Sequence, residues 1–329
     1  MKKITLIILL AGLLLAGCGK DKTKDEAALS PDSPNPQSQE EQKAAEIKEP
    51  QLPGAILVMV DNHRKAYPQS GLDKADWVYE IIAEGGITRY MALYYHEEAE
   101  RIGPVRSARY YFVQLAKGYN APLAHAGGNQ DALQLIHDIK MKDLDEIYNS
   151  GAYFWRDKAR KMPHNLYSGT DKLVQGAQAR KLSLVAPPTF PEATGQVKGS
   201  PHGDITIDYS VGKYTYIVTW HYNGDHYERS MDGKKHVMED GISITADNII
   251  VMTAQTKEVV KEQLESEIKL IGKGSAYYFM DKMAAQGSWE KTSASASLKF
   301  YDENGAPLKI KPGKTWVQVI PGPSALSYH

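Results

Sequence analysis

Two arginines three residues apart, Arg106 and Arg109, are the side chains of this sequence best placed to bind an anion. They follow Pro104, and proline is favoured at the first position of a helix, so the pattern predicts a helix from Pro104 to about Gly118. At this spacing both arginines lie on one helix face. Cations in a first turn oppose the positive end of the helix dipole, and a bound phosphate or carboxylate would remove that conflict.

The same two arginines have a structural interpretation, in which each pairs with an acid from the preceding segments. The candidate acids are Asp61, Glu80 and Glu84. Under that interpretation no ligand is needed to balance the guanidinium charges. The sequence leaves both interpretations open. Arg89, in an apolar segment upstream, is a third arginine that could join an anion site.

The segment from His125 to Asn129 has the order histidine, alanine, two glycines and asparagine, at a predicted change from strand to helix. Paired glycines there can present backbone amides to a ligand, although they serve tight turns more often. His125 is either an acid–base group of such a site or a buried histidine held by hydrogen bonds.

A proline-bounded loop supplies further candidates: Arg156, His164 and Asn165, with Pro163 before the last two. Histidine and asparagine are short, directional hydrogen-bonding groups, and loops are where binding residues tend to lie. The alternative is that Asn165 caps the loop and that the segment has only a structural role. A ligand site would require these side chains to meet Arg106 and Arg109.

Several function classes are excluded by what the sequence lacks. It has no G-x-S-x-G elbow, no H-E-x-x-H helix, no phosphate-binding Walker loop and no G-x-G-x-x-G. No full set of metal ligands is evident, so we expect neither a metal nor a cofactor. Residues 1–18 carry +2 and residues 19–50 carry five lysines against eight acids, so the chain's net charge of −1 leaves residues 51–329 neutral. A neutral body is not expected to bind nucleic acid.

The N-terminus predicts export and lipid attachment. Lys2 and Lys3 precede an uncharged apolar run that is too short for a stop-transfer helix and ends in Leu-Ala-Gly-Cys at Cys18. This pattern predicts a signal peptide over residues 1–17 and a lipid on Cys18, the only cysteine of the chain. Residues 18–50 are polar and lack aromatic side chains, so they predict a disordered linker.

In the part of the chain that carries these candidate residues, strand and helix signals alternate from residue 51 to about 190. We expect strands at 55–60, 76–83, 87–95 and 121–126, and helices at 104–118, 129–139 and 170–182. From residue 200 to 329 the signals are mostly strands, with turns at Asn223-Gly224, Asp232-Gly233 and Asn304-Gly305. The sequence therefore predicts an α/β (α+β) N-terminal lobe over 51–190 and a β-rich C-terminal lobe over 200–329.

Several longer motifs resemble the YerB-like lipoprotein family. They cover nearly all of residues 53–321 and include Val60-Asp61-Asn62, Glu84 to Arg89, Ile102 to Arg109, His125 to Gly128, Pro163 to Tyr167 and Pro312 to Trp316. The resemblance implies a two-part architecture and attachment to the cell surface. It implies no reaction.

A second likeness concerns the order of a strand with an arginine, a Pro-Val-Arg-x-x-Arg segment and a Gly-Gly before a helix. This order is similar to the LytR-CpsA-Psr envelope phosphotransferases, which bind a lipid pyrophosphate through arginines and magnesium through aspartate. The likeness would give Arg89, Arg106 and Arg109 the arginine role and Asp61 or Asp76 the metal role. Ser107 stands where that family has an acid, and this departure weakens the analogy.

Three functions follow as hypotheses for a protein anchored on the extracytoplasmic face of the cell membrane by its lipid. The first is binding of an anionic envelope ligand, phosphate- or carboxylate-bearing, through the arginine cluster. The second is a metal-dependent phosphotransferase or phosphodiesterase acting on a cell-wall polymer, with Asp61 or His164 essential. The third is an adaptor that binds a protein partner through an exposed apolar patch.

Overall fold

The computed structural model describes residues 49–193, 198–211, 214–258 and 266–329. The predicted signal peptide, Cys18 and all but the end of the predicted linker lie outside these residues. Among the described helices none is long and apolar enough to span a bilayer.

The largest sheet takes strands from both halves of the chain. Its order is β19-β18-β17-β14-β20-β2-β3-β1-β4-β5, with β8 paired to β18. The bounds are β1 Ile56–Asp61, β2 Trp77–Glu84, β3 Ile87–Tyr94, β4 Leu123–His125, β5 Asp143–Asp145, β8 Ser200–Pro201, β14 Asn248–Thr253, β17 Gly272–Met280, β18 Met283–Lys291, β19 Lys299–Asp302 and β20 Thr315–Ile320.

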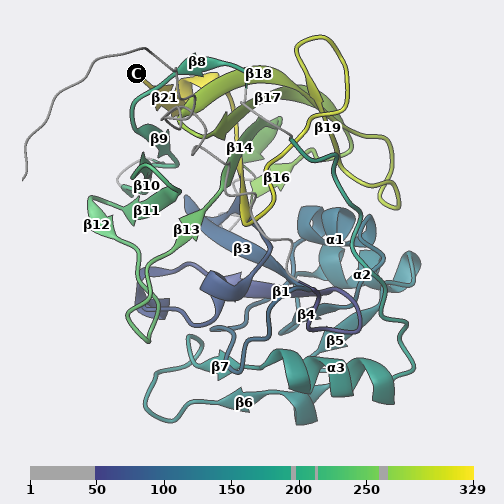
Figure 1. The fold of residues 1–329 in the computed structure, drawn as a ribbon. Coiled ribbons are helices and arrows are strands. Elements are labelled where there is room, and N and C mark those ends of the chain that lie inside the picture. The colour runs from purple at the N-terminus through teal and green to yellow at the C-terminus, as the bar shows by residue number, and fades with distance from the viewer. Residues whose placement is uncertain (1–48, 194–197, 212–213, 259–265) are drawn as a thin grey trace, which may run out of the picture. The chain divides into compact units, whose positions relative to one another are not determined.

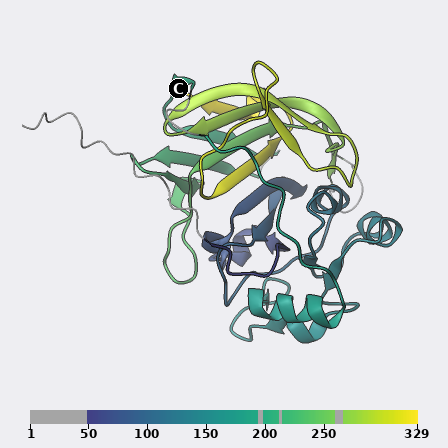
Figure 2. The same ribbon diagram turned by 45° about the vertical axis from the view of Figure 1, so that its right-hand side comes forward.

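The expected division into two lobes is not confirmed, because β20 lies between β2 and β14 and is parallel to both. The final long strand of the chain thus pairs with a strand from residues 77–84. Figures 1 and 2 show the blue strands of the first half continuing into the green and yellow strands of the second. Strands β1 and β20 are buried over their whole length, which is consistent with their mostly apolar sequences.

A second, six-stranded sheet lies within residues 205–328. Its path is β12-β11-β10-β9-β21, with β13 on β11. The predicted turns at Asn223-Gly224 and Asp232-Gly233 join β10 to β11 and β11 to β12. The bounds are β9 Ile205–Asp208, β10 Ile217–Tyr222, β11 Tyr227–Met231, β12 Lys234–Lys235, β13 Thr245–Ala246 and β21 Leu326–Tyr328; two small sheets pair β6 Trp155–Arg156 with β7 Leu166–Tyr167, and β15 Thr256–Glu258 with β16 Ser266–Ile268.

Three α-helices are described: α1 Tyr110–Lys117, α2 Gln130–Asp138 and α3 Thr170–Ala179. Helices α1 and α2 pack against each other, while α3 contacts β1 and β5 (Figure 1). Asn129 caps α2, since its side chain accepts a hydrogen bond from the amide of Ala132. Short 3-10 turns cover Arg64–Ala66, Leu72–Lys74, Gly151–Tyr153 and Pro323–Ala325.

Three neighbouring parallel strands end in an ionisable residue. Strand β1 ends at Asp61, β4 at His125 and β5 at Asp145, and the three strands are adjacent in the sheet. Ligands of sheets with parallel strands bind beyond the carboxyl ends of those strands. This edge of the sheet is therefore where a functional site is expected, and the candidate residues of the sequence lie there or on the segments that follow.

Candidate functional site

The segment before α1 is extended, so the predicted helix start at Pro104 is wrong. Helix α1 begins at Tyr110, and Arg109 is its N-cap residue in extended backbone. The preceding residues pair with β1 instead. The amide of Arg106 donates to the carbonyl of Met59 at 2.9 Å, and the amide of Asp61 donates to the carbonyl of Pro104 at 2.8 Å. Arg106 therefore does not lie in the first turn of a helix, and the dipole argument does not apply to it.

The carboxylate of Asp61 is the centre of the site. It is 2% exposed at the end of β1. His164 Nδ1 donates to its Oδ2 at 2.6 Å, and the amide of His63 donates to its Oδ1 at 2.9 Å. Arg106 Nε lies 3.3 Å from the same Oδ2. The structure thus brings His164 and Arg106, which are 58 positions apart in the sequence, onto one buried carboxylate.

Asp61 is ionised in this setting. Burial alone would raise its pKa, but the hydrogen bond from His164 and the charges of Arg106 and Arg89 outweigh burial and hold the pKa below its ordinary value. An ionised carboxylate only accepts hydrogen bonds, so His164 Nδ1 carries a proton. No described residue forms a hydrogen bond with the other ring nitrogen, Nε2.

His63 is a residue of the site that the sequence did not indicate. Its ring stacks on that of His164, with centroids 4.7 Å apart and planes 19° apart. Burial and the neighbouring His164 lower the pKa of His63. The only available signal was its position two residues after Asp61, where its amide binds that carboxylate.

Arg89 and Arg109 follow the structural interpretation, because both pair with Oε1 of Glu84. Arg89 also donates to the carbonyl of Ser107 at 2.8 Å, and Arg109 to that of Ala108 at 2.9 Å. Their guanidinium groups are nearly buried. Their roles are therefore to hold the extended segment 107–109 against β2 and β3.

Arg106 differs from these two arginines. Its side chain is 22% exposed and its one ion pair runs through Nε to Asp61, without the alignment of a hydrogen bond. Within the described ranges, no atom accepts a hydrogen bond from its terminal nitrogens. Burial and the charge of Arg89 lower its pKa while Asp61 raises it, and the net direction is downward. The terminal nitrogens of Arg106 are therefore available to donate hydrogen bonds to a ligand, and the guanidinium lies near a second cation, Arg89.

Arg156 and Asn165 form a separate pair. Arg156 donates to Asn165 Oδ1 at 3.2 Å and to Glu146 Oε1 at 3.2 Å. Asn165 Nδ2 in turn donates to the carbonyls of Asp157 and Arg160. Asn165 thus caps the loop, which is the structural role that the sequence offered as the alternative to ligand binding. No contact in the described part of the chain joins Arg156 directly to Asp61.

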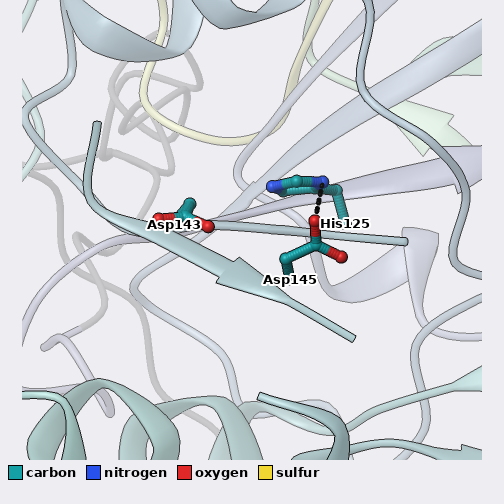
Figure 3. Close-up of side chains that lie close together, drawn as sticks. All are labelled: His125, Asp143 and Asp145. Atoms are coloured by element: carbon teal, nitrogen blue, oxygen red, sulfur yellow. Dashed lines mark ion pairs between the residues drawn. The ribbon is translucent and has the colours of Figure 1, made fainter. Parts of the chain in front are cut away.

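His125 lies at the end of β4, fully buried. Its Nδ1 is 2.9 Å from the carbonyl of Gly127 and 3.7 Å from Asp145 Oδ2 (Figure 3). The amide of Gly127 donates to Asp145 Oδ1 at 2.8 Å, so this glycine amide is directed at a carboxylate of the chain itself. Asp143 completes the group. Sequence reasoning missed both acids, although aspartates two positions apart in a strand share one face.

A buried polar network connects Asp61 with the second half of the chain. Gln69 Nε2 donates to the carbonyl of Asp61 at 3.1 Å, and Gln69 Oε1 accepts from His236 Nε2 at 2.9 Å. His236 Nδ1 lies 2.6 Å from Arg229, which pairs with Glu80. Burial and the charge of Arg229 hold the pKa of His236 well below its usual value, so His236 is neutral.

Comparisons with known proteins cover almost the whole chain. Residues 42–183 match the N-terminal domain model described as "Protein of unknown function (DUF3048)", and residues 205–317 match the DUF3048 C-terminal domain model. The Bacillus subtilis (strain 168) protein named "Putative lipoprotein YerB" is 29% identical over 319 residues, 95% of this chain and 93% of that protein. The crystal structure of the Bacillus subtilis YerB protein aligns with a TM-score of 0.77 over 84% of this chain and 93% of the other.

Proposed function

The chain belongs to the family with paired DUF3048 N- and C-terminal domains, and from that premise we propose that it is a membrane-anchored lipoprotein that binds an anionic ligand at Arg106. The proposed anchor is a lipid on Cys18, on the extracytoplasmic face. It is supported by the cysteine motif after the apolar N-terminal run and by the word "lipoprotein" in the name of the similar Bacillus subtilis protein.

One observation carries the ligand proposal: the terminal nitrogens of the partly exposed Arg106 donate to none of the described residues. A guanidinium offers planar, paired donors that match a phosphate or a carboxylate.

Arg106→Gln is expected to abolish stabilisation of the full chain by its anion, measured as a shift in thermal midpoint in detergent. The probes are inorganic phosphate, pyrophosphate and muropeptides, each with and without Mg²⁺. A ligand at 100 times its Kd stabilises the native state by about 2.7 kcal/mol. Losing the guanidinium removes the donors that recognise the anion.

The matched control is Arg180→Gln. Arg180 has comparable side-chain exposure, 32%, and one weak ion pair, 3.9 Å from Asp143. The Arg180→Gln variant should show the same anion-induced shift in thermal midpoint as the native chain. If Arg106→Gln responds to the anions as the native chain does, or if no probe shifts the native midpoint, Arg106 is structural and a protein partner becomes the better hypothesis.

A second candidate function, transfer or hydrolysis of a phosphodiester in a wall polymer, is favoured by the pairing of Asp61 with His164. A buried carboxylate that holds Nδ1–H leaves Nε2 as a general base. Arg106, beside the same carboxylate, would stabilise negative charge on the reacting phosphate. The 2.6 Å between Nδ1 of His164 and Oδ2 of Asp61 supports this role.

Under this second function, His164→Gln is expected to lower turnover of a chromogenic phosphodiester, assayed with Mg²⁺ or Mn²⁺, by about 10²- to 10⁴-fold. His96→Gln is the control, because His96 forms a similar pair with Asp76, Nδ1 to Oδ1 2.8 Å, outside the site. Equal losses in both variants, or no turnover by the native chain, would argue for binding alone.

A further inference from the structure

We propose that His125, Asp143 and Asp145 bind a divalent transition-metal ion at the ends of β4 and β5. Each residue offers one ligand atom, which for His125 is one of its two ring nitrogens, and the three atoms lie within 4.8 Å of one another. This site is distinct from the anion site at Arg106, and the proposal does not depend on that function.

Strand pairing places the three side chains together. Strands β4 and β5 run parallel with His125 opposite Asp145 and Leu123 opposite Asp143. Because side chains alternate along a strand, Asp143 and Asp145 point to the same face as His125. In Figure 3 one ring nitrogen of His125 faces Asp145, and the other lies on the side of Asp143. The sheet therefore holds all three ligands without help from a flexible loop.

The independent sign of a ligand is the second ring nitrogen of His125. The residue is 0% exposed, and its Nδ1 donates to the carbonyl of Gly127 at 2.9 Å. The proton is thus on Nδ1, and Nε2 is a buried acceptor with no partner among the described residues. A buried polar atom without a partner is costly to the fold, and an ion would supply one. Metal-binding histidines characteristically donate their other N–H to a carbonyl or carboxylate.

Both carboxylates are held in place and each keeps an oxygen for an ion. Asp145 Oδ1 accepts the amides of Gly127 and Ile147, whereas no described group donates a hydrogen bond to its Oδ2. Asp143 Oδ2 accepts from Asn149 at 2.7 Å, and the nearest cation to Oδ1 is Arg180 at 3.9 Å. In metal sites, hydrogen bonds from residues that do not touch the ion orient the side chains that bind it.

The donor set selects the class of ion. Two carboxylates and a neutral imidazole carry −2, which a divalent ion balances. One nitrogen and two oxygens suit Mn²⁺, Fe²⁺ or Zn²⁺ better than Mg²⁺ or Ca²⁺, which prefer oxygen ligands alone. His125 and Asp145 are almost fully buried, so the ion would chiefly hold β4 and β5 together.

The test uses the full chain, stripped with a chelator and dialysed against Mn²⁺, with Mg²⁺ as comparator. Mn²⁺ is chosen because carboxylate and imidazole groups are suitable ligands for it. We expect one Mn²⁺ per chain by mass spectrometry, and pulsed EPR should show coupling to nitrogen of one imidazole. Asp143→Asn should weaken binding at least about tenfold, since even outer-shell losses cost 10- to 100-fold. His125→Gln should remove the nitrogen coupling.

Matched controls lie on the neighbouring helix. Asp138→Asn and His137→Gln change exposed residues of α2 and should bind Mn²⁺ as the native chain does. Absence of bound Mn²⁺ in the native chain, bound Mn²⁺ without nitrogen coupling, or native affinity in Asp143→Asn would overturn the proposal. If His125→Gln fails to fold, the affinity of Asp143→Asn and the native nitrogen coupling still decide.

Discussion

Replacing Glu80 by glutamine is expected to lower the free energy of unfolding by about 3–5 kcal/mol, because it leaves Arg229 charged and unpaired in the core. Both side chains are 0% exposed, and Arg229 donates to Glu80 Oε2 at 2.7 Å. The other carboxylate oxygen accepts from Thr88 at 2.7 Å and from Asn62 at 3.2 Å. The loss would be a large part of the 5–15 kcal/mol that stabilises an ordinary domain.

Arg229 cannot relieve the loss by giving up its proton. In the native chain burial acts to lower its pKa, and Glu80 outweighs burial and raises it above the ordinary value. Without Glu80 the guanidinium still keeps its proton, because arginine is not deprotonated in proteins. The guanidinium lies over the ring of Trp316, 5.0 Å from its centroid, and the Arg229 side chain is 0% exposed, so solvent does not contact it. This pair joins β2 to β11, and its loss should weaken the contact between the two halves of the chain.

Urea unfolding at pH 7 of four chains measures this effect: native, Glu80→Gln, Arg229→Met and the double variant. The double variant should be more stable than either single variant, because it buries no unpaired charge. Glu228→Gln, on the same strand, removes a surface partner of Lys235 and should cost less than about 1 kcal/mol. Strictly additive losses in the double variant would mean that the pair is not coupled.

Local signals in the sequence were sufficient for several strands of the fold. The continuous apolar run at 55–60 became β1, and the strands expected at 76–83 and 87–95 became β2 and β3. Turns at Asn223-Gly224 and Asp232-Gly233 were also predictable, because each needs backbone conformations that glycine adopts readily. In each case the interactions that determine the local structure act between residues that are close in the sequence.

The predictions that failed depended on distant partners. The segment after Ile102 was expected to enter a helix at Pro104, but its backbone bonds go to Met59, Leu166 and Ser70, far away in sequence. Likewise, a β-rich segment was expected over residues 200–329, but the position of β20 between β2 and β14 was not predicted. Which strands pair is set by the tertiary fold, and local propensity carries no information about it.

The candidate site was predictable as a set of residues and not as an arrangement. Asp61 and Glu84 were among the acids expected to pair with arginines, and they do. Glu84 pairs with two arginines, whereas the terminal nitrogens of Arg106 form no hydrogen bond with a described residue. This difference depends on how β1, β2 and β3 lie side by side in the sheet. The group of His125, Asp143 and Asp145 needed the β4–β5 register, which no local pattern gives.

Lys291 gives the second large effect: its contribution to the stability of the chain is expected to increase as pH rises from 7 to 9.5. Its side chain is buried, with Nζ donating to the carbonyls of Ala294 and Ala296. Burial lowers its pKa to about 8, whereas an unfolded lysine has a pKa of about 10.4. Between these values the unfolded chain binds the extra proton, so stability increases with pH.

The full difference amounts to about 3 kcal/mol, at 1.36 kcal/mol per pKa unit, and about 2 kcal/mol of it should appear between pH 7 and 9.5. Urea unfolding across this range measures it by comparing the native chain with Lys291→Met, which lacks the titrating group. Lys299→Met changes an exposed lysine on β19 and should keep the native slope. Parallel curves for the native chain and Lys291→Met would mean that the ammonium group stays protonated in the fold, held by its two carbonyl partners strongly enough to offset burial.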